Sequence, residues 1–102
     1  MTATPQTPYP RVTLRYCTRC NWLLRAAWLA QELLQTFNSD LGEVVLQPGD
    51  GGIFQIHVET ENGHRELIWC RATEQGFPEA KTLKQRLRDQ IAPGRDLGHS
   101  DR

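Results

Sequence analysis

Alternating apolar and polar residues predict β-strands at two places in the chain. Residues 11–16 and 53–59 have the two-residue period of a half-buried strand. A valine-containing segment at 43–47 reads as a further strand, and the hairpin dipeptide Asn62-Gly63 joins 53–59 to a fourth strand at 65–70. The apolar sides of the two alternating strands consist of Val12, Leu14, Tyr16, Phe54, Ile56 and Val58.

Apolar residues spaced three and four apart predict two helices. The first spans 21–37, and the second starts at the Pro78-Glu79 pair and ends before Pro93-Gly94. The expected core stripe of the first helix is Leu23, Ala27, Ala30, Leu34 and Phe37, and that of the second is Ala80, Leu83, Leu87 and Ile91.

The element order is therefore β-α-β-β-β-α. A strand-helix-strand unit favours a parallel right-handed crossover, whereas a hairpin is antiparallel, so we expect a four-stranded mixed sheet. Polar residues on one side of the strands indicate that both helices cover the other face, which gives an α/β two-layer sandwich. We expect one domain at 11–92, flanked by disordered tails at 1–10 and 93–102 that are poor in apolar residues.

The charge balance excludes several classes of partner. Twelve basic residues offset twelve acidic ones, so no net field favours nucleic acid or a membrane surface. The chain has neither a signal-peptide pattern at its start nor an apolar run of about 18 residues. Three cysteines, two of them close together, are not the pattern of a secreted disulfide scaffold. We therefore expect a cytoplasmic protein without nucleic-acid or membrane partners.

The motif Cys17-Thr18-Arg19-Cys20 lies between the first strand and the first helix. Two cysteines three residues apart can close a short disulfide, and a helix start favours a thiolate. The charge of Arg19 acts in the same direction. We expect redox chemistry at this pair rather than a role as small core residues.

Metal binding is the competing interpretation of a close cysteine pair. Zinc needs four ligands, but the chain has no second cysteine pair, and His57 and His64 have the wrong spacing. A copper-chaperone domain would need another strand after the last helix. We expect neither a metal nor a cofactor.

The chain resembles the Rdx family, also called the selenoprotein W/T/H type, with cysteine in place of selenocysteine. The resemblance covers 11–92 and rests on the segments 12–20, 51–54, 67–69 and 76–80. It implies a thioredoxin-like fold and a glutathione- or thioredoxin-linked redox role. Selenocysteine in the family falls at the position of Cys20, whereas analogy with thioredoxin makes Cys17 the nucleophile and Cys20 its partner, which is the order we favour.

A docking surface for the redox partner is expected beside the motif. On the first helix Trp22, Arg25 and Leu29 lie off the expected core stripe, and the Gly51-Gly52 turn lets a partner backbone approach. A position of Trp22 at the edge of the core is an equally open reading. Two functions fit the sequence: an oxidoreductase acting on a protein or glutathione, and a redox-sensing interaction module without turnover.

Overall fold

The computed structural model describes residues 7–101, and the predicted order of strands and long helices is confirmed. The elements are β1 (Arg11–Cys17), α1 (Leu23–Phe37), β2 (Glu43–Gly49), β3 (Phe54–Glu59), β4 (Arg65–Cys70), α2 (Arg71–Glu74), α3 (Ala80–Ile91) and the 3₁₀ helix η1 (Gly98–Asp101). The short elements α2 and η1 were not predicted. Of the N-terminal tail expected at 1–10, residues 1–6 lie outside the described residues.

The four strands form one sheet in the order β2-β1-β3-β4. Strand β1 is parallel to β2 and antiparallel to β3, which in turn is antiparallel to β4, so the predicted mixed sheet is confirmed. Val12 pairs with Val58 and Leu14 with Ile56. Because paired residues point to the same face, these side chains form one continuous apolar surface.

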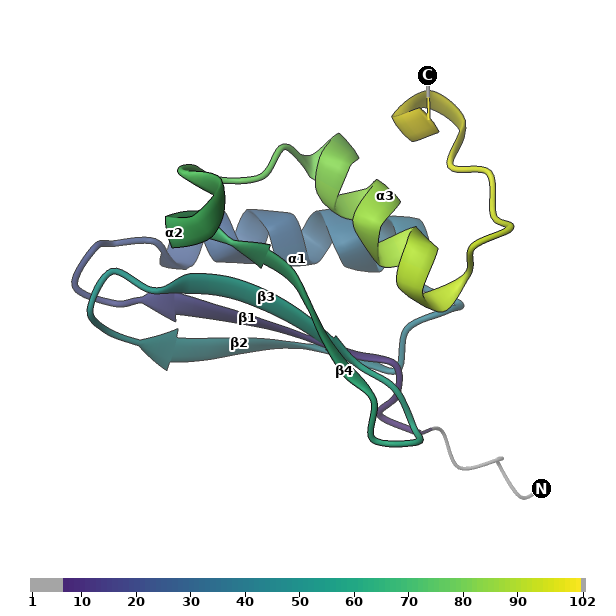
Figure 1. The fold of residues 1–102 in the computed structure, drawn as a ribbon, viewed down its shortest axis with the longest axis horizontal. Helices are drawn as coiled ribbons and strands as arrows, with labels where there is room; N and C mark the ends of the chain where they lie inside the picture. The colour runs from purple at the N-terminus through teal and green to yellow at the C-terminus, as the bar shows by residue number, and fades with distance from the viewer. Residues whose placement is uncertain (1–6, 102) are drawn as a thin grey trace.

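Helices α1 and α3 contact each other, and Figure 1 shows both above the sheet. The core lies between this helical layer and the apolar sheet face, where Leu33, Leu83 and Leu87 are fully buried. The opposite sheet face carries polar residues such as Arg15 and His57. The arrangement is consistent with a thioredoxin-like fold.

The predicted core stripe of α1 is wrong at several positions. The buried residues are Ala26, Leu29, Ala30, Leu33 and Phe37, whereas Leu23 and Leu34 are 46% and 44% exposed. Leu24 and Trp28 are also exposed, so this helix is apolar around much of its circumference. Periodicity does not choose between two overlapping apolar stripes, and the contact with the sheet decides which one is buried.

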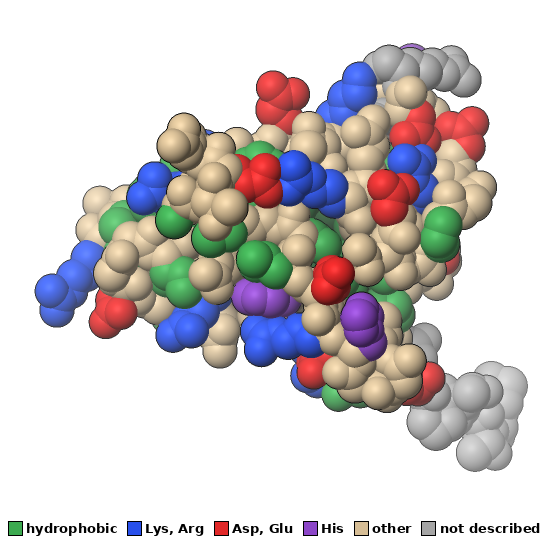
Figure 2. Space-filling model, in the orientation of Figure 1, with side chains coloured by type: hydrophobic (Ala, Val, Ile, Leu, Met, Phe, Trp, Pro, Cys, Tyr) green, Lys and Arg blue, Asp and Glu red, His purple; other side chains and the backbone are tan. Residues whose placement is uncertain are grey.

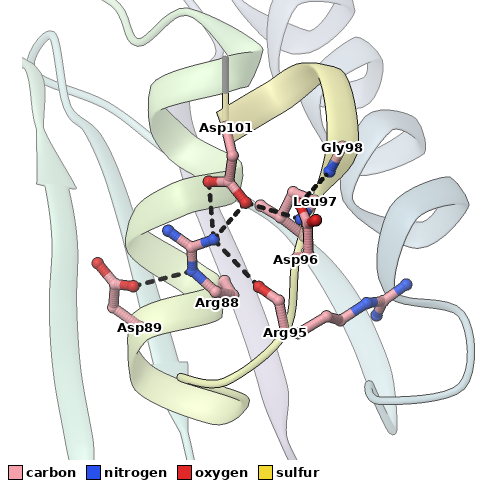
Figure 3. Close-up of polar contacts among 7 residues, drawn as sticks. All are labelled: Arg88, Asp89, Arg95, Asp96, Leu97, Gly98 and Asp101. Atoms are coloured by element: carbon pink, nitrogen blue, oxygen red, sulfur yellow. Dashed lines mark hydrogen bonds and ion pairs between the residues drawn. The ribbon is translucent and has the colours of Figure 1, made fainter.

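The C-terminal segment, for which the composition predicts a disordered tail, contacts the folded domain. Figure 3 shows that Arg88 of α3 binds both carboxylate oxygens of Asp101, at 2.6 and 2.7 Å, and donates to the carbonyl of Arg95. The Arg95 guanidinium pairs with Asp40, and Leu97 packs against the core. These contacts tie 93–101 to α3 and to the end of α1.

Candidate active site

The two motif cysteines lie side by side at one end of the sheet. Cys17 is the last residue of β1, and the Sγ atom of Cys20 lies 2.6 Å from its Sγ. Both are free thiols; Cys17 is 1% exposed, whereas Cys20 is half-buried. Since a disulfide bond is about 2.05 Å long, an oxidant that removes two electrons and the two thiol protons could join the sulfurs with only a small movement.

The loop that carries the cysteines is held by backbone hydrogen bonds. The Cys17 N–H donates to the carbonyl of Ile53 at 2.8 Å, and the Thr18 N–H donates to that of Gly49 at 3.0 Å. Asn21 has a φ of 60°, a left-handed conformation that asparagine tolerates. Helix α1 then begins at Leu23, two residues later than the predicted start at Asn21.

Each sulfur changes the acidity of the other. The hydrogen bond from Cys20 lowers the pKa of Cys17, and backbone N–H groups of Gly52, Cys20 and Arg19 lower it further against the effect of desolvation. The same hydrogen bond, with burial and the charge of Cys17, raises the pKa of Cys20. The pair therefore favours a state in which Cys17 is the thiolate and Cys20 holds the proton.

Two predicted site features act through the backbone. Gly51 and Gly52 have φ values of 70° and 77°, which glycine adopts without strain, and this turn presents the Gly52 N–H to Cys17. Arg19 is exposed and contributes its backbone N–H to Cys17. The charge that favours a thiolate at Cys20 comes instead from Arg71, a residue without a sequence signal.

An aromatic cluster borders the cysteines. The Trp22 ring meets Phe54 and Phe77 edge-on at centroid distances of 6.2 and 4.9 Å, and Phe54 meets Phe77 at 5.0 Å. Trp22 is half-buried and packs against the core, which favours the core-edge reading over a freely exposed docking residue. In the sequence, Phe77 is recognisable only as part of a helix start, so its contacts with Trp22 and Phe54 beside the cysteines were not predicted.

Two arginines cover this aromatic cluster. The Arg25 guanidinium carbon lies 4.1 Å from the centroid of Phe77, and that of Arg71 lies 4.8 Å from Trp22 and 5.9 Å from Phe77. The predicted docking surface is wrong at Leu29, which is 1% exposed because it belongs to the stripe of α1 that faces the sheet. Of the predicted helix residues, Trp22 and Arg25 thus lie beside the motif.

A hollow of about 460 Å³ adjoins the motif loop. It is lined by Tyr16, Thr18, Asn21, Leu23 and Leu24, and Leu24 is 81% exposed. Apolar side chains thus continue outward from the loop that carries the cysteines.

Cys70 lies apart from the pair, at the end of β4. It is half-buried rather than enclosed in the core, and hydrogen bonds from Thr73, with smaller contributions from Gln55 and Ala72, lower its pKa. The thiol of Cys70 can therefore also react with disulfide reagents in any assay of the Cys17–Cys20 pair.

Residues 7–101 contain no group of three or more histidine, cysteine, aspartate or glutamate side chains placed to hold a metal ion. In the same part of the chain, no helix is long and apolar enough to cross a membrane.

The fold and the cysteine pair define a thioredoxin-like protein with a CxxC motif. The chain belongs to the Rdx family, whose model matches residues 11–89. Family and motif together indicate a redox-related function.

Two solved structures are similar to this chain. A selenoprotein W-related protein from Vibrio cholerae is 52% identical, with 79% of this chain and 95% of that chain covered and a TM-score of 0.72. A protein from Bordetella parapertussis is 59% identical, with 79% and 96% covered and the same TM-score. No curated protein matches the chain.

Proposed function

We propose that this protein is a cytoplasmic thiol-disulfide oxidoreductase that uses Cys17 and Cys20. The observation that carries the proposal is the sulfur pair itself, in which two free thiols 2.6 Å apart have pKa values shifted in opposite directions. Such a pair supplies a thiolate nucleophile and a second thiol within reach of the mixed disulfide.

The reaction transfers two electrons from the pair to a disulfide. One motif thiolate attacks a substrate sulfur, forming a mixed disulfide and releasing the other substrate sulfur as a thiolate. The second motif cysteine loses its proton and attacks its partner within the protein, which closes the Cys17-Cys20 disulfide and releases the remaining substrate thiolate. The pair is oxidised and the substrate disulfide is reduced to two thiols.

Two observations favour different orders of attack. The lowered pKa favours Cys17 as the first nucleophile, which is the order that we propose. Cys20 is the more exposed of the two, which favours the reverse order. Single serine variants distinguish them, because the first nucleophile still forms a mixed disulfide when its partner is serine. With Cys70 also replaced by serine, Cys20→Ser is expected to trap a peptide disulfide and Cys17→Ser is not; trapping only by Cys17→Ser would reverse the order.

A turnover assay tests the oxidoreductase and its linkage to cellular thiols. The oxidised protein is incubated with NADPH and either glutathione with glutathione reductase or thioredoxin with thioredoxin reductase, together with a disulfide substrate. Steady NADPH consumption that is lost in both single serine variants is expected. If the disulfide forms and changes partner binding while NADPH consumption stays at background, the protein is a redox-sensing module instead.

A further inference from the structure

Of the nine arginines in residues 7–101, five have no carboxylate partner, and Arg25 and Arg71 are two of these five. Arg11, Arg86, Arg88 and Arg95 each form an ion pair. Within residues 7–101, neither Arg25 nor Arg71 lies within 4 Å of a carboxylate, and the buried Nε of Arg71 has no hydrogen-bond acceptor. Buried donors in native proteins normally have an acceptor, so Arg71 has hydrogen-bonding capacity that no described residue uses.

The positions of the two arginines are set by aromatic rings. Arg25 stacks on Phe77, and Arg71 lies over Trp22 with Phe77 also within 6 Å of its guanidinium carbon. Stacking uses the flat face of a guanidinium and leaves its N–H groups, which lie in the plane, available to an acceptor. Two guanidinium groups therefore lie near the Phe77 ring, with N–H donors available to bind an acceptor.

This arrangement adjoins the reactive sulfurs. The charge of Arg71 acts on Cys20, and its guanidinium approaches Gly52, whose N–H reaches Cys17. Arg15 in β1 and Arg19 in the motif loop also have no ion pair within the described residues, and Asp50 is the acidic residue of the facing turn. Figure 2 shows blue side chains, alongside red, at the left-hand end where β1 and β2 finish.

We propose that Arg25 and Arg71 form a carboxylate-binding site that selects disulfide substrates with an acidic group near the reacting sulfur. The inference rests on the proposed redox function and adds the chemical class of the substrate. Guanidinium groups bind carboxylates through paired N–H donors, and a carboxylate bound here would place the attached disulfide beside the Cys17–Cys20 pair. A small carboxylate-bearing disulfide and an acidic protein segment share this chemistry.

Two chromogenic disulfides test the site. Dithiobis-nitrobenzoate carries two carboxylates and dithiodipyridine carries none, yet both are reduced to coloured thiols as the pair is oxidised. The measured quantity is the ratio of their rate constants in a Cys70→Ser background. Any change in sulfur acidity affects both rates, whereas loss of a carboxylate contact affects only the first. The ratio therefore separates binding from the effect of Arg71 on Cys20.

Arg25→Gln and Arg71→Gln are each expected to lower the ratio, by about tenfold for a charge-assisted hydrogen bond. Arg71→Lys should restore part of the loss, because it keeps the charge but not the planar donors. Arg65→Gln is the matched control, since Arg65 at the start of β4 also has no ion pair within residues 7–101 and is remote from the cysteines in the strand register. Melting temperatures of all variants establish that the folded protein is being compared.

The outcomes separate this proposal from the redox function. A ratio that is unchanged by both glutamine variants, or lowered equally by Arg65→Gln, overturns the carboxylate site while leaving exchange intact. If neither reagent oxidises the pair, the redox function itself is refuted. Peptide disulfides flanked by glutamate or by glutamine identify which kind of substrate carries the carboxylate. A preference for the glutamate peptide that is lost in the glutamine variants indicates an acidic protein segment. A rate loss confined to dithiobis-nitrobenzoate indicates a small substrate.

Discussion

Replacing Trp22 with alanine distinguishes a residue that supports the fold from one that serves only for docking. The substitution removes edge contacts with Phe54 and Phe77 and the stacking of Arg71. Aromatic pairs contribute about 0.5–1.5 kcal/mol each, and a partly exposed cation–π contact adds about 0.5–1 kcal/mol. Full truncation of a buried tryptophan costs about 3–5 kcal/mol, so a half-buried one should cost about 2–3 kcal/mol.

That loss of stability is large enough to measure by thermal unfolding. For a domain of about 100 residues, 1 kcal/mol shifts the melting temperature by about 4–8 °C, so Trp22→Ala should lower it by about 10–20 °C. Trp28→Ala is the control, because Trp28 lies on α1, the helix that Trp22 directly precedes, but is 50% exposed. If Trp22→Ala has the same melting temperature as Trp28→Ala but forms mixed disulfides slowly, the structural role is refuted and Trp22 is assigned to docking.

Three further predictions concern the sulfur pair and the C-terminal segment. Cys20→Ala should raise the pKa of Cys17, because it removes the hydrogen-bond donor; the pKa is measured from thiolate absorbance in a Cys70→Ser background. Cys20→Ser keeps a donor and should raise the pKa of Cys17 less. Equal pKa values in the two variants would show that the donor is unimportant. Mild oxidation should give a reversible Cys17-Cys20 disulfide on peptide mapping, and dimers linked only through Cys70 would contradict this. The ion pair with Arg88 lowers the pKa of Asp101, so its stabilising effect is present above the ordinary aspartate pKa and is lost as the pH falls through the lowered value. Asp101→Asn should therefore lower the melting temperature at neutral pH but not at strongly acidic pH; a loss that persists in acid would exclude the ion pair as its cause.

The sequence by itself determined the order of the elements and the location of the chemistry. Alternation at 11–16 and 53–59 and the hairpin dipeptide Asn62-Gly63 reflect local backbone preferences, which depend on neighbouring residues. The position of Cys17 and Cys20 between a strand and a helix follows from the same local patterns. These features needed no knowledge of distant contacts.

The tertiary structure decided which apolar side of α1 is buried and which charges meet the cysteines. Leu29 faces the sheet and Leu23 faces outward because packing selects one of two overlapping stripes. Arg71 follows Cys20 by about fifty positions in the chain, and only the pairing of β3 with β1 and β4 brings it to the motif. Contacts across such sequence distances carry no periodic signal, so the arginines and the aromatic rings beside the sulfurs became visible only in the folded chain.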